Sequence, residues 1–112
     1  MSADGPTYAI NLIPLRLGVP SVDFERFSAT VDQPTCLAHD VVQGFDAYVV
    51  VRRDPGAPSV DIVEVMQVRS WDEWVSVRDN SPTMKKVVEG FEALVDPAAV
   101  KTLFGRRIDR KE

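Results

Sequence analysis

The chain has 112 residues, a formal net charge of −4 and a hydrophobic fraction of 45%. This length suits one domain, and the composition is that of a globular protein, which excludes disordered, collagen-like and coiled-coil chains. The acidic balance argues against a nucleic-acid duplex or an anionic membrane as the partner. The single cysteine, Cys36, and the single histidine, His39, exclude an internal disulfide and a Cys/His zinc cluster.

Domain organisation follows from where the polar residues gather. Residues 1–7 (MSADGPT) are small and polar, so we expect a flexible N-terminal arm. Residues 8–108 form the single predicted domain, and residues 109–112 form a charged C-terminal end. Residues 1–20 lack the basic region of a signal peptide, and no apolar run approaches the ~18 residues of a membrane span. We therefore expect a cytoplasmic protein.

The first third of the domain predicts a strand, a helix and a loop. Residues 8–15 (YAINLIPL) are apolar and β-branched, which indicates a strand. Apolar residues then recur with helical spacing over 21–31, and Ser21 is a suitable N-cap. Residues 32–40 (DQPTCLAHD) have no period and contain Pro34, so we predict an irregular loop there.

The middle of the chain predicts an antiparallel hairpin. Residues 41–53 and 59–69 are both rich in β-branched and aromatic side chains. The connection between them contains Pro55 and Gly56. Proline at the second turn position and glycine at the third are the requirements of a type II turn.

The last third predicts a broken helix and a final strand. Ser70 and Glu73 have the spacing of a capping box, in which each side chain bonds the backbone amide of the other. A short helix follows, and a longer one begins with Ser81 as its cap and Pro82 in its first turn. Residues 100–108 (VKTLFGRRI) indicate the last strand.

This order of elements predicts an α+β fold of the ferredoxin-like, split βαβ type. Its four-stranded antiparallel sheet would carry all helices on one face. Residues 49–51 and 62–63 are consecutive apolar residues, which indicates that both faces of the sheet are at least partly buried. A second copy stacked on the uncovered face would bury it, so we predict a homodimer of the dimeric α+β barrel type.

Several segments together resemble the RedY-like (HapK) family of small bacterial proteins, within the wider dimeric α+β barrel group. They are YAINLIPLRLGV, FERF with VDQPTC, GFDAYVVVRRDPGAPSVDIVEVMQV and FGRRI, and the resemblance spans about Tyr8 to Ile108. The resemblance implies that the protein acts in a pathway for prodigiosin-type or bisindole natural products. Its role there would be that of a cofactor-independent cyclase or of a partner that handles an intermediate. The implied substrates are oxygen-sensitive aromatic imines or enamines.

The chain departs from the plant polyketide cyclases of the same group. Those proteins carry a His-Pro-x-His stretch at the start of the second long helix, where this chain has Ser81-Pro82-Thr83-Met84. Relatives often place a histidine in the first strand, where this chain has Asn11. The resemblance therefore does not imply an unchanged polyketide aldol mechanism.

Two side chains are candidates for proton transfer. His39 is the one histidine of the chain, and histidine is the side-chain type that ordinarily titrates near neutral pH. It is either a proton shuttle or an exposed loop histidine. Glu64 shares a strand face with Ile62 and Met66, so burial would raise its pKa. It would then serve as a general acid or base, or as counter-ion for an iminium. The alternative is a buried salt bridge to an arginine of residues 52–53.

Five further residues are candidates for substrate binding. The Asn11 amide can orient a substrate carbonyl or carboxylate, or satisfy backbone groups. The aromatic rings of Tyr48 and Trp74 can line a pocket for a flat ligand or pack in the core. Cys36 is either a nucleophile or a small buried apolar residue, and Asp46 lies near a strand end where solvation is easy.

The leading hypothesis is a dimeric, cofactor-free cyclase for a reactive aromatic intermediate, with His39 and Glu64 moving protons. Its partners would be the small aromatic substrate, a second copy of the chain and an upstream biosynthetic enzyme. The second hypothesis is a non-catalytic, chaperone-like protein that binds the intermediate or a partner enzyme. The third is a haem-degrading or quinol-oxidising monooxygenase of the same group. No sequence motif for a nucleotide, a phosphate or a zinc hydrolase is present.

Overall fold

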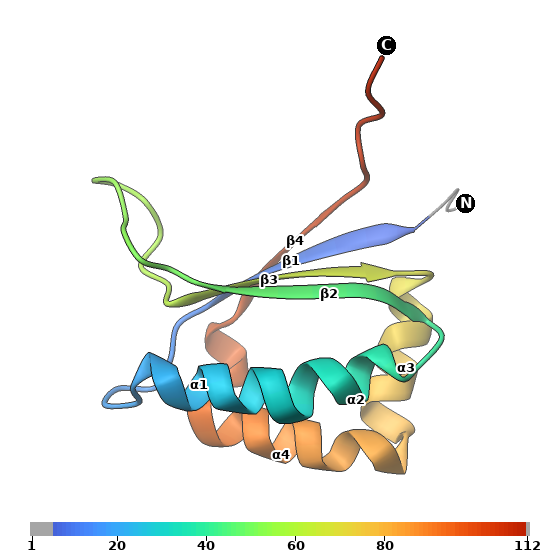
Figure 1. Cartoon of the computed structure of the whole chain (residues 1–112), viewed down its shortest axis with the longest axis horizontal. Helices are drawn as coiled ribbons and strands as arrows, with labels where there is room; N and C mark the ends of the chain where they lie inside the picture. The colour runs from blue at the N-terminus through green and yellow to red at the C-terminus, as the bar shows by residue number, and fades with distance from the viewer. Residues whose placement is uncertain (1–5, 112) are drawn as a thin grey trace.

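The computed structural model describes residues 6–111 and contains one four-stranded antiparallel sheet. Its strands are β1 (Thr7–Ile13), β2 (Val42–Val49), β3 (Ile62–Val68) and β4 (Lys101–Gly105), in the spatial order β2-β3-β1-β4. The helices lie on one side of this sheet (Figure 1). The ferredoxin-like α+β architecture expected from the sequence is confirmed.

One long helical stretch follows β1. It comprises α1 (Ser21–Phe27), a π-helical turn η1 (Ser28–Asp32) and α2 (Gln33–Leu37), which run on without a break (Figure 1). The helix begins at Ser21 as a helical residue after Pro20, not with Ser21 as its side-chain cap. The loop predicted for residues 32–40 is wrong as far as Leu37, because those residues continue the helix.

The π turn explains how a helix passes through a proline. Pro34 has no backbone N–H and so cannot bond the carbonyl four residues before it. Here the backbone N–H of Gln33 bonds the carbonyl of Ser28, five residues back, which is a π-helical bond. The wider turn just before Pro34 accommodates the hydrogen bond that proline cannot make, and the helix continues to Leu37.

The hairpin is confirmed, with shorter strands than expected. The backbone N–H of Ala57 donates to the carbonyl of Asp54 over 3.0 Å, and Gly56 has a φ of +88°. These are the features of the predicted type II turn, with Pro55 and Gly56 at its centre. The strands stop at Val49 and restart at Ile62, because the proline-containing connection leaves the sheet ladder.

A second helical segment connects β3 to β4. It consists of α3 (Trp71–Asn80), the 3₁₀ turn η2 (Pro82–Met84), α4 (Lys85–Leu94) and the 3₁₀ turn η3 (Pro97–Ala99). The predicted long helix thus opens with a 3₁₀ turn. Pro82 is in its first turn as expected, but the Ser81 hydroxyl contacts Thr83 Oγ1 at 2.9 Å and caps no backbone amide.

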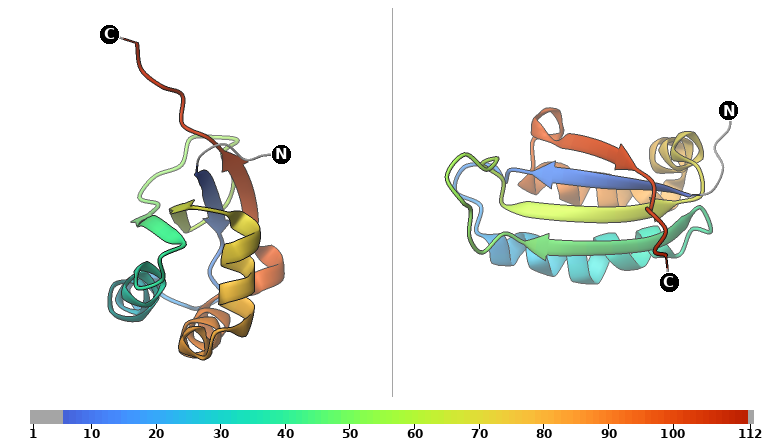
Figure 2. Two further views of the ribbon diagram at one scale, coloured as in Figure 1. Left: turned by 90° about the vertical axis from the view of Figure 1, so that its right-hand side faces the viewer. Right: turned by 90° about the horizontal axis from the view of Figure 1, so that it is seen from above.

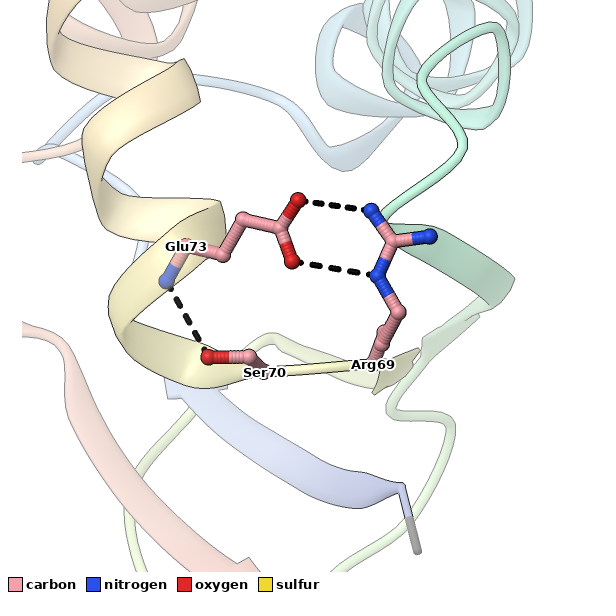
Figure 3. A network of polar contacts seen from close by, with 3 residues as sticks. All are labelled: Arg69, Ser70 and Glu73. Atoms are coloured by element: carbon pink, nitrogen blue, oxygen red, sulfur yellow. Dashed lines mark hydrogen bonds and ion pairs between the residues drawn. The ribbon is translucent and has the colours of Figure 1, made fainter.

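Half of the predicted capping box is present at the start of α3. Ser70 Oγ accepts a hydrogen bond from the backbone N–H of Glu73 over 3.2 Å. The Glu73 carboxylate does not reach back to Ser70, and instead accepts two hydrogen bonds from the Arg69 guanidinium, at 3.1 and 2.6 Å (Figure 3). A bidentate charged pair is stronger than a bond to a neutral amide, so the carboxylate turns to the arginine.

The first and last strands of the chain are also shorter than predicted. β1 ends at Ile13, because Pro14 has no amide and the backbone N–H of Leu15 donates to the carboxylate of Asp61 over 2.8 Å. β4 ends at Gly105, and the chain then rises away from the helices (Figure 1). Residues 1–5 of the predicted arm and Glu112 lie outside the described part of the chain, and Thr7 already belongs to β1.

The helices pack on the sheet through two apolar clusters. One contains Ile13, Phe24, Ile62 and Val95, and the other is larger and includes Met66. The α1 and α4 segments approach closely where Phe27 crosses Gly90, since a Cβ built on Gly90 would meet Phe27 Cε1 at 2.5 Å. A glycine is therefore needed at this helix crossing.

The sheet has two faces of opposite character. The inner face points to the helices and carries Asn11, Ile13, Phe45, Glu64, Met66 and Thr102. The open face carries Ile10, Leu12, Tyr48, Val63, Val65 and Leu103. The end-on view in Figure 2 shows every helix of the described chain on the same side, so the open face has no covering layer within one protomer.

Candidate functional site

A cavity of about 460 Å³ lies between the helices and the inner face of the sheet. Residues of α3, η2 and α4 form most of its walls, and residues of all four strands form its floor. Its volume is that of a site for a small organic ligand. Apolar and aromatic side chains form most of the lining, among them Phe45, Met66, Trp71, Trp74, Met84 and Phe91.

A chain of hydrogen bonds crosses the cavity floor from β4 to β3. Thr102 Oγ1 donates to Asn11 Oδ1 over 2.8 Å, and Asn11 Nδ2 donates to Glu64 Oε1 over 3.2 Å. The strand register produces this alignment, because Asn11 pairs directly with Thr102 on one side and Glu64 on the other. Since a threonine hydroxyl can donate, it sets the orientation of the Asn11 amide, whose N–H groups then point at Glu64.

Asp32, in the π turn η1, brings a second carboxyl group to the same place. It is 5% exposed, and its Oδ1 accepts a hydrogen bond from Cys36 Sγ over 3.3 Å. The carboxyl groups of Asp32 and Glu64 are close enough to change each other's pKa through charge and hydrogen bonding. Two carboxyl groups from a helix and a strand therefore meet at the cavity floor.

Burial dominates the electrostatics of this acid pair. Loss of hydration raises the pKa of Glu64 to about 8, and the negative charge of Asp32 adds to the shift. Loss of hydration also raises the pKa of Asp32, to about 6, against the opposing effect of its hydrogen bonds with Cys36 and Glu64. Like charges so close together oppose one another's ionisation, which favours the state in which only one of the two acids is ionised.

Glu64 Oε2 has no hydrogen-bond donor among residues 6–111, although the atom is buried. Leaving a buried carboxylate oxygen without a donor is costly. The shared proton supplies the missing donor when it lies between Glu64 and Asp32. A ligand N–H that reaches this oxygen would take the place of that proton.

The walls of the cavity are aromatic, whereas its rim and its floor carry charged or acidic residues. Trp74 is 4% exposed, and the Trp71 ring packs edge-on against Phe104 with ring centroids 4.8 Å apart. At the rim, Arg78 Nε donates to Asp79 Oδ1 over 3.0 Å, and Glu92 also lines the opening. The lining thus runs from charged residues at the rim, through aromatic walls, to buried acids at the floor.

Four of the residues proposed from the sequence line this cavity: Asn11, Cys36, Glu64 and Trp74. Burial raises the pKa of the Cys36 thiol, mainly by desolvation and also through the charge of Asp32, so it stays protonated and donates to that carboxylate. The alternative in which Glu64 forms a salt bridge to an arginine of residues 52–53 is not realised. Arg52 pairs with Asp54, and Arg53 bonds Ser59.

Three others lie elsewhere. His39 follows the end of α2, and its Nε2 lies 2.9 Å from Thr83 Oγ1, outside the cavity lining. Asp46 and Tyr48 alternate with the inward residues of β2 and so belong to the opposite side of the sheet, where Tyr48 is 56% exposed. The structure does not bring these three to the acid pair.

Asp32 and Thr102 were not recognised as site residues from the sequence. Phe24, Ser28, Asp32 and Cys36 recur every four residues and are all buried, which is the signal that could have identified Asp32. A step of four residues overshoots one α-helical turn by about 40°, and a wider π turn offsets that drift. Thr102 has no comparable signal, because its role depends on pairing with Asn11 across the sheet.

The comparisons with known proteins agree with this architecture. The sequence profile of the family described as REDY-like protein HapK matches residues 7–108. The crystal structure of HapK from Hahella chejuensis is similar with a TM-score of 0.74 and 20% identity, over 95% of this chain and 96% of that one. No curated protein matches the chain significantly.

Two more distant structures share the fold. A dabb family protein with a ferredoxin-like fold from Mesorhizobium loti has a TM-score of 0.66 and 12% identity, over 95% of this chain and 100% of that one. A dimeric ferredoxin-like protein of unknown function from Thermobifida fusca has a TM-score of 0.68 and 12% identity, over 94% of each chain. Within residues 6–111, no helix has the length and apolarity to cross a bilayer, and no three potential ligand side chains cluster around a metal position.

Proposed function

The chain belongs to the REDY-like protein HapK family, and from that premise we propose that it is a cofactor-independent cyclase of bacterial natural-product biosynthesis. Its substrate is a reactive aromatic imine or enamine of the bisindole or pyrrole type. The observation that carries this proposal is the buried acid pair of Glu64 and Asp32 at the floor of an aromatic cavity. A carboxylic acid that keeps its proton near neutral pH is suited to general acid catalysis.

The proposed reaction needs one proton donated and one removed. The protonated acid pair, through Glu64, donates a proton to the imine nitrogen, which makes the imine carbon more electrophilic. A ring carbon of the second aromatic group then attacks, and a C–C bond closes the new ring. The carboxylate takes the proton that the attacking ring carbon must lose to regain aromaticity. The acid pair ends as it began, and no oxidant or reductant is required.

The rest of the cavity supports orientation rather than proton transfer. Asn11 is held by Thr102 and directs its amide N–H at Glu64, so it positions the acid for the substrate. Trp71 and Trp74 line the wall, and their indole rings can pack against an aromatic intermediate. Confinement of the two reacting groups raises their effective concentration and excludes water, which would hydrolyse an imine.

The proposed functional unit is a homodimer formed through the open face. Ile10, Leu12, Val63 and Val65 are only partly buried there, and Leu103 is 58% exposed. An aliphatic sheet face of this kind is stabilised by burial against a partner, and a second copy offers the same surface. The upstream enzyme that makes the unstable imine is the further partner implied by this reaction.

The test is incubation of the purified protein with the imine produced by the upstream reaction, with product ratios followed by liquid chromatography. We expect a cyclised product that is reduced by at least about 100-fold in Glu64→Gln, since general acid–base groups contribute that much or more. Glu89→Gln makes the same chemical change on the exposed side of α4 and is the matched control.

The outcome also separates catalysis from binding. If wild type and Glu64→Gln give the same product ratio as buffer, while the intermediate survives longer with either protein, the cyclase proposal fails and the chain is a protective binding protein. His39→Ala is included as a further arm. Loss of the cyclised product in that variant alone would move the proton-transfer group from the cavity to the end of α2.

A further inference from the structure

The cavity contains an unusual balance of charges for a site that is otherwise apolar. Its floor holds two acids, Asp32 and Glu64, and its rim holds two more, Asp79 and Glu92. Arg78 is the one basic side chain in the lining, and it is already paired with Asp79 at 3.0 Å. Even with one proton on the floor acids, the cavity has a negative balance, which repels anions and attracts cations.

We propose that the cavity selects ligands by a protonated nitrogen carried on a flat aromatic body, with Glu64 and Asp32 as its counter-ions. This rests on the proposed function and deepens it: the iminium that forms when the acid pair gives its proton to the substrate is held by the same two counter-ions as a ligand that is already protonated in solution. An aromatic ammonium or iminium group has the N–H donors and the positive charge that the floor lacks.

Glu64 Oε2 marks the position of the ligand nitrogen. Glu64 is 4% exposed and faces the cavity, and Oε2 has no donor from the described chain, whereas Oε1 is already bonded by Asn11. A ligand N–H placed against Oε2 forms a charge-assisted hydrogen bond, the strongest kind that this carboxylate can accept. The shared proton that satisfies the free protein then leaves as the cation enters.

The neighbouring groups favour this exchange. Around the floor, Cys36 donates to Asp32, Asn11 donates to Glu64, and Thr102 faces Asn11, so every polar contact from the surrounding elements goes to an acid or to the amide that holds one. Within the described chain, the lining places no basic residue at the floor as a competing counter-ion. The indole faces of Trp71 and Trp74 add an electron-rich wall that favours a cation over a neutral group.

The test uses three ligands of similar size that differ in charge: tryptamine, tryptophol and indole-3-acetate. Their dissociation constants are measured by isothermal titration calorimetry at neutral pH with the wild-type protein. We expect tryptamine to bind at least about ten-fold more tightly than tryptophol, and indole-3-acetate to bind weakest. Repeating the titration in buffers of different ionisation enthalpy should show release of up to about one proton per tryptamine and none for tryptophol.

Variants locate the selectivity. Glu64→Gln keeps the shape of the side chain and should weaken tryptamine to the affinity of tryptophol, with tryptophol changed by less than about two-fold. Asp32→Asn should remove the proton release and weaken tryptamine by a smaller factor, and it carries the test if Glu64→Gln does not fold. Glu89→Gln, on the outer side of α4, is the matched control and should leave all three affinities unchanged.

Equal affinities for tryptamine and tryptophol, or absence of binding by all three ligands, would overturn the inference. So would a preference for tryptamine that survives in both Glu64→Gln and Asp32→Asn. The cyclase proposal is judged separately by product formation. Cation selectivity without cyclisation leaves this inference standing and removes the cyclase, whereas cyclisation without cation selectivity does the reverse.

Discussion

Each face of the sheet holds residues that are unusual for their surroundings, polar groups on the covered face and aliphatic groups on the open face. The inner face, which the helices cover, carries the hydrogen-bonded chain of Thr102, Asn11 and Glu64. The open face, which no helix of the described chain covers, carries aliphatic residues such as Ile10 and Val65. Neither arrangement stabilises an isolated protomer, since a buried acid is costly and an exposed aliphatic face is not stabilised by burial.

Each face is thus adapted to something outside the protomer. The inner face gives up apolar packing in favour of a cavity with titrating groups, which is suited to a ligand. The open face is suited to a second protein surface. Both sets of residues lie on the same strands at alternate positions, so neighbouring substitutions can separate the two roles.

The largest effect is expected from a charge at the centre of the open face. Ile10 lies between Val65 and Leu103 in the sheet, so Ile10→Lys would bury an ammonium group against aliphatic side chains in the proposed dimer. We expect the dimer dissociation constant to rise at least about 100-fold. Sedimentation velocity measures this, with Leu17→Lys in an exposed loop as the control. A variant that stays dimeric would place the interface elsewhere.

The acid pair of the inner face should make the protein less stable as the pH rises. In the folded state the pKa values of Glu64 and Asp32 are raised to about 8 and about 6. The unfolded chain releases these protons earlier, so the folded state binds more protons in between and its stability falls as the pH rises through that range. We expect a loss of roughly 3 to 4 kcal/mol between about pH 5 and about pH 8 that depends on Glu64.

Urea unfolding of wild type and Glu64→Gln at both pH values checks this expectation. The variant should be the more stable of the two at the higher pH, because a glutamine amide can donate to Asp32 without any ionisation. Parallel pH profiles for the two proteins would mean that Glu64 titrates normally and is not the buried acid described here.

Adjacent residues of β4 sharpen the comparison between the faces. Thr102→Val removes the donor to Asn11 Oδ1, and we expect a loss of about 1 kcal/mol in unfolding free energy with the dimer intact. Leu103→Thr removes apolar area from the open face, and we expect weaker dimerisation with the ligand affinity unchanged. If both variants behave alike, the two faces are not functionally distinct.

The smallest effect is expected from Tyr48→Phe. The Tyr48 side chain lies on the open face, away from the acid pair, so loss of its hydroxyl should change the yield of cyclised product by less than about two-fold. Chromatography of the same reaction measures it. A loss of ten-fold or more would indicate that the substrate binds between the two sheets of a dimer instead of in the cavity.

Local patterns in the sequence predicted much of the architecture. The type II turn at Gly56 and the Ser70 cap of α3 depend on residues that are close in the chain, and both are confirmed. The burial of Glu64 followed from its apolar neighbours at alternate positions of one strand. These inferences need only the local period of the backbone.

The errors arose where a local rule was overridden by a contact elsewhere. Pro34 predicted the end of a helix, but the π turn before it let the helix continue and carried Cys36 into the core. The Glu73 carboxylate accepts hydrogen bonds from the Arg69 guanidinium, which is a stronger partner than the predicted backbone amide of Ser70.

The order of the elements, the antiparallel hairpin and the presence of an acid on a buried strand face could be predicted from the sequence, because period and turn chemistry are local properties. Only the tertiary structure decided that Asp32 meets Glu64, that Thr102 orients Asn11, and that His39 and Tyr48 lie away from them. Those contacts join residues far apart in the chain, and strand register and helix packing bring them together.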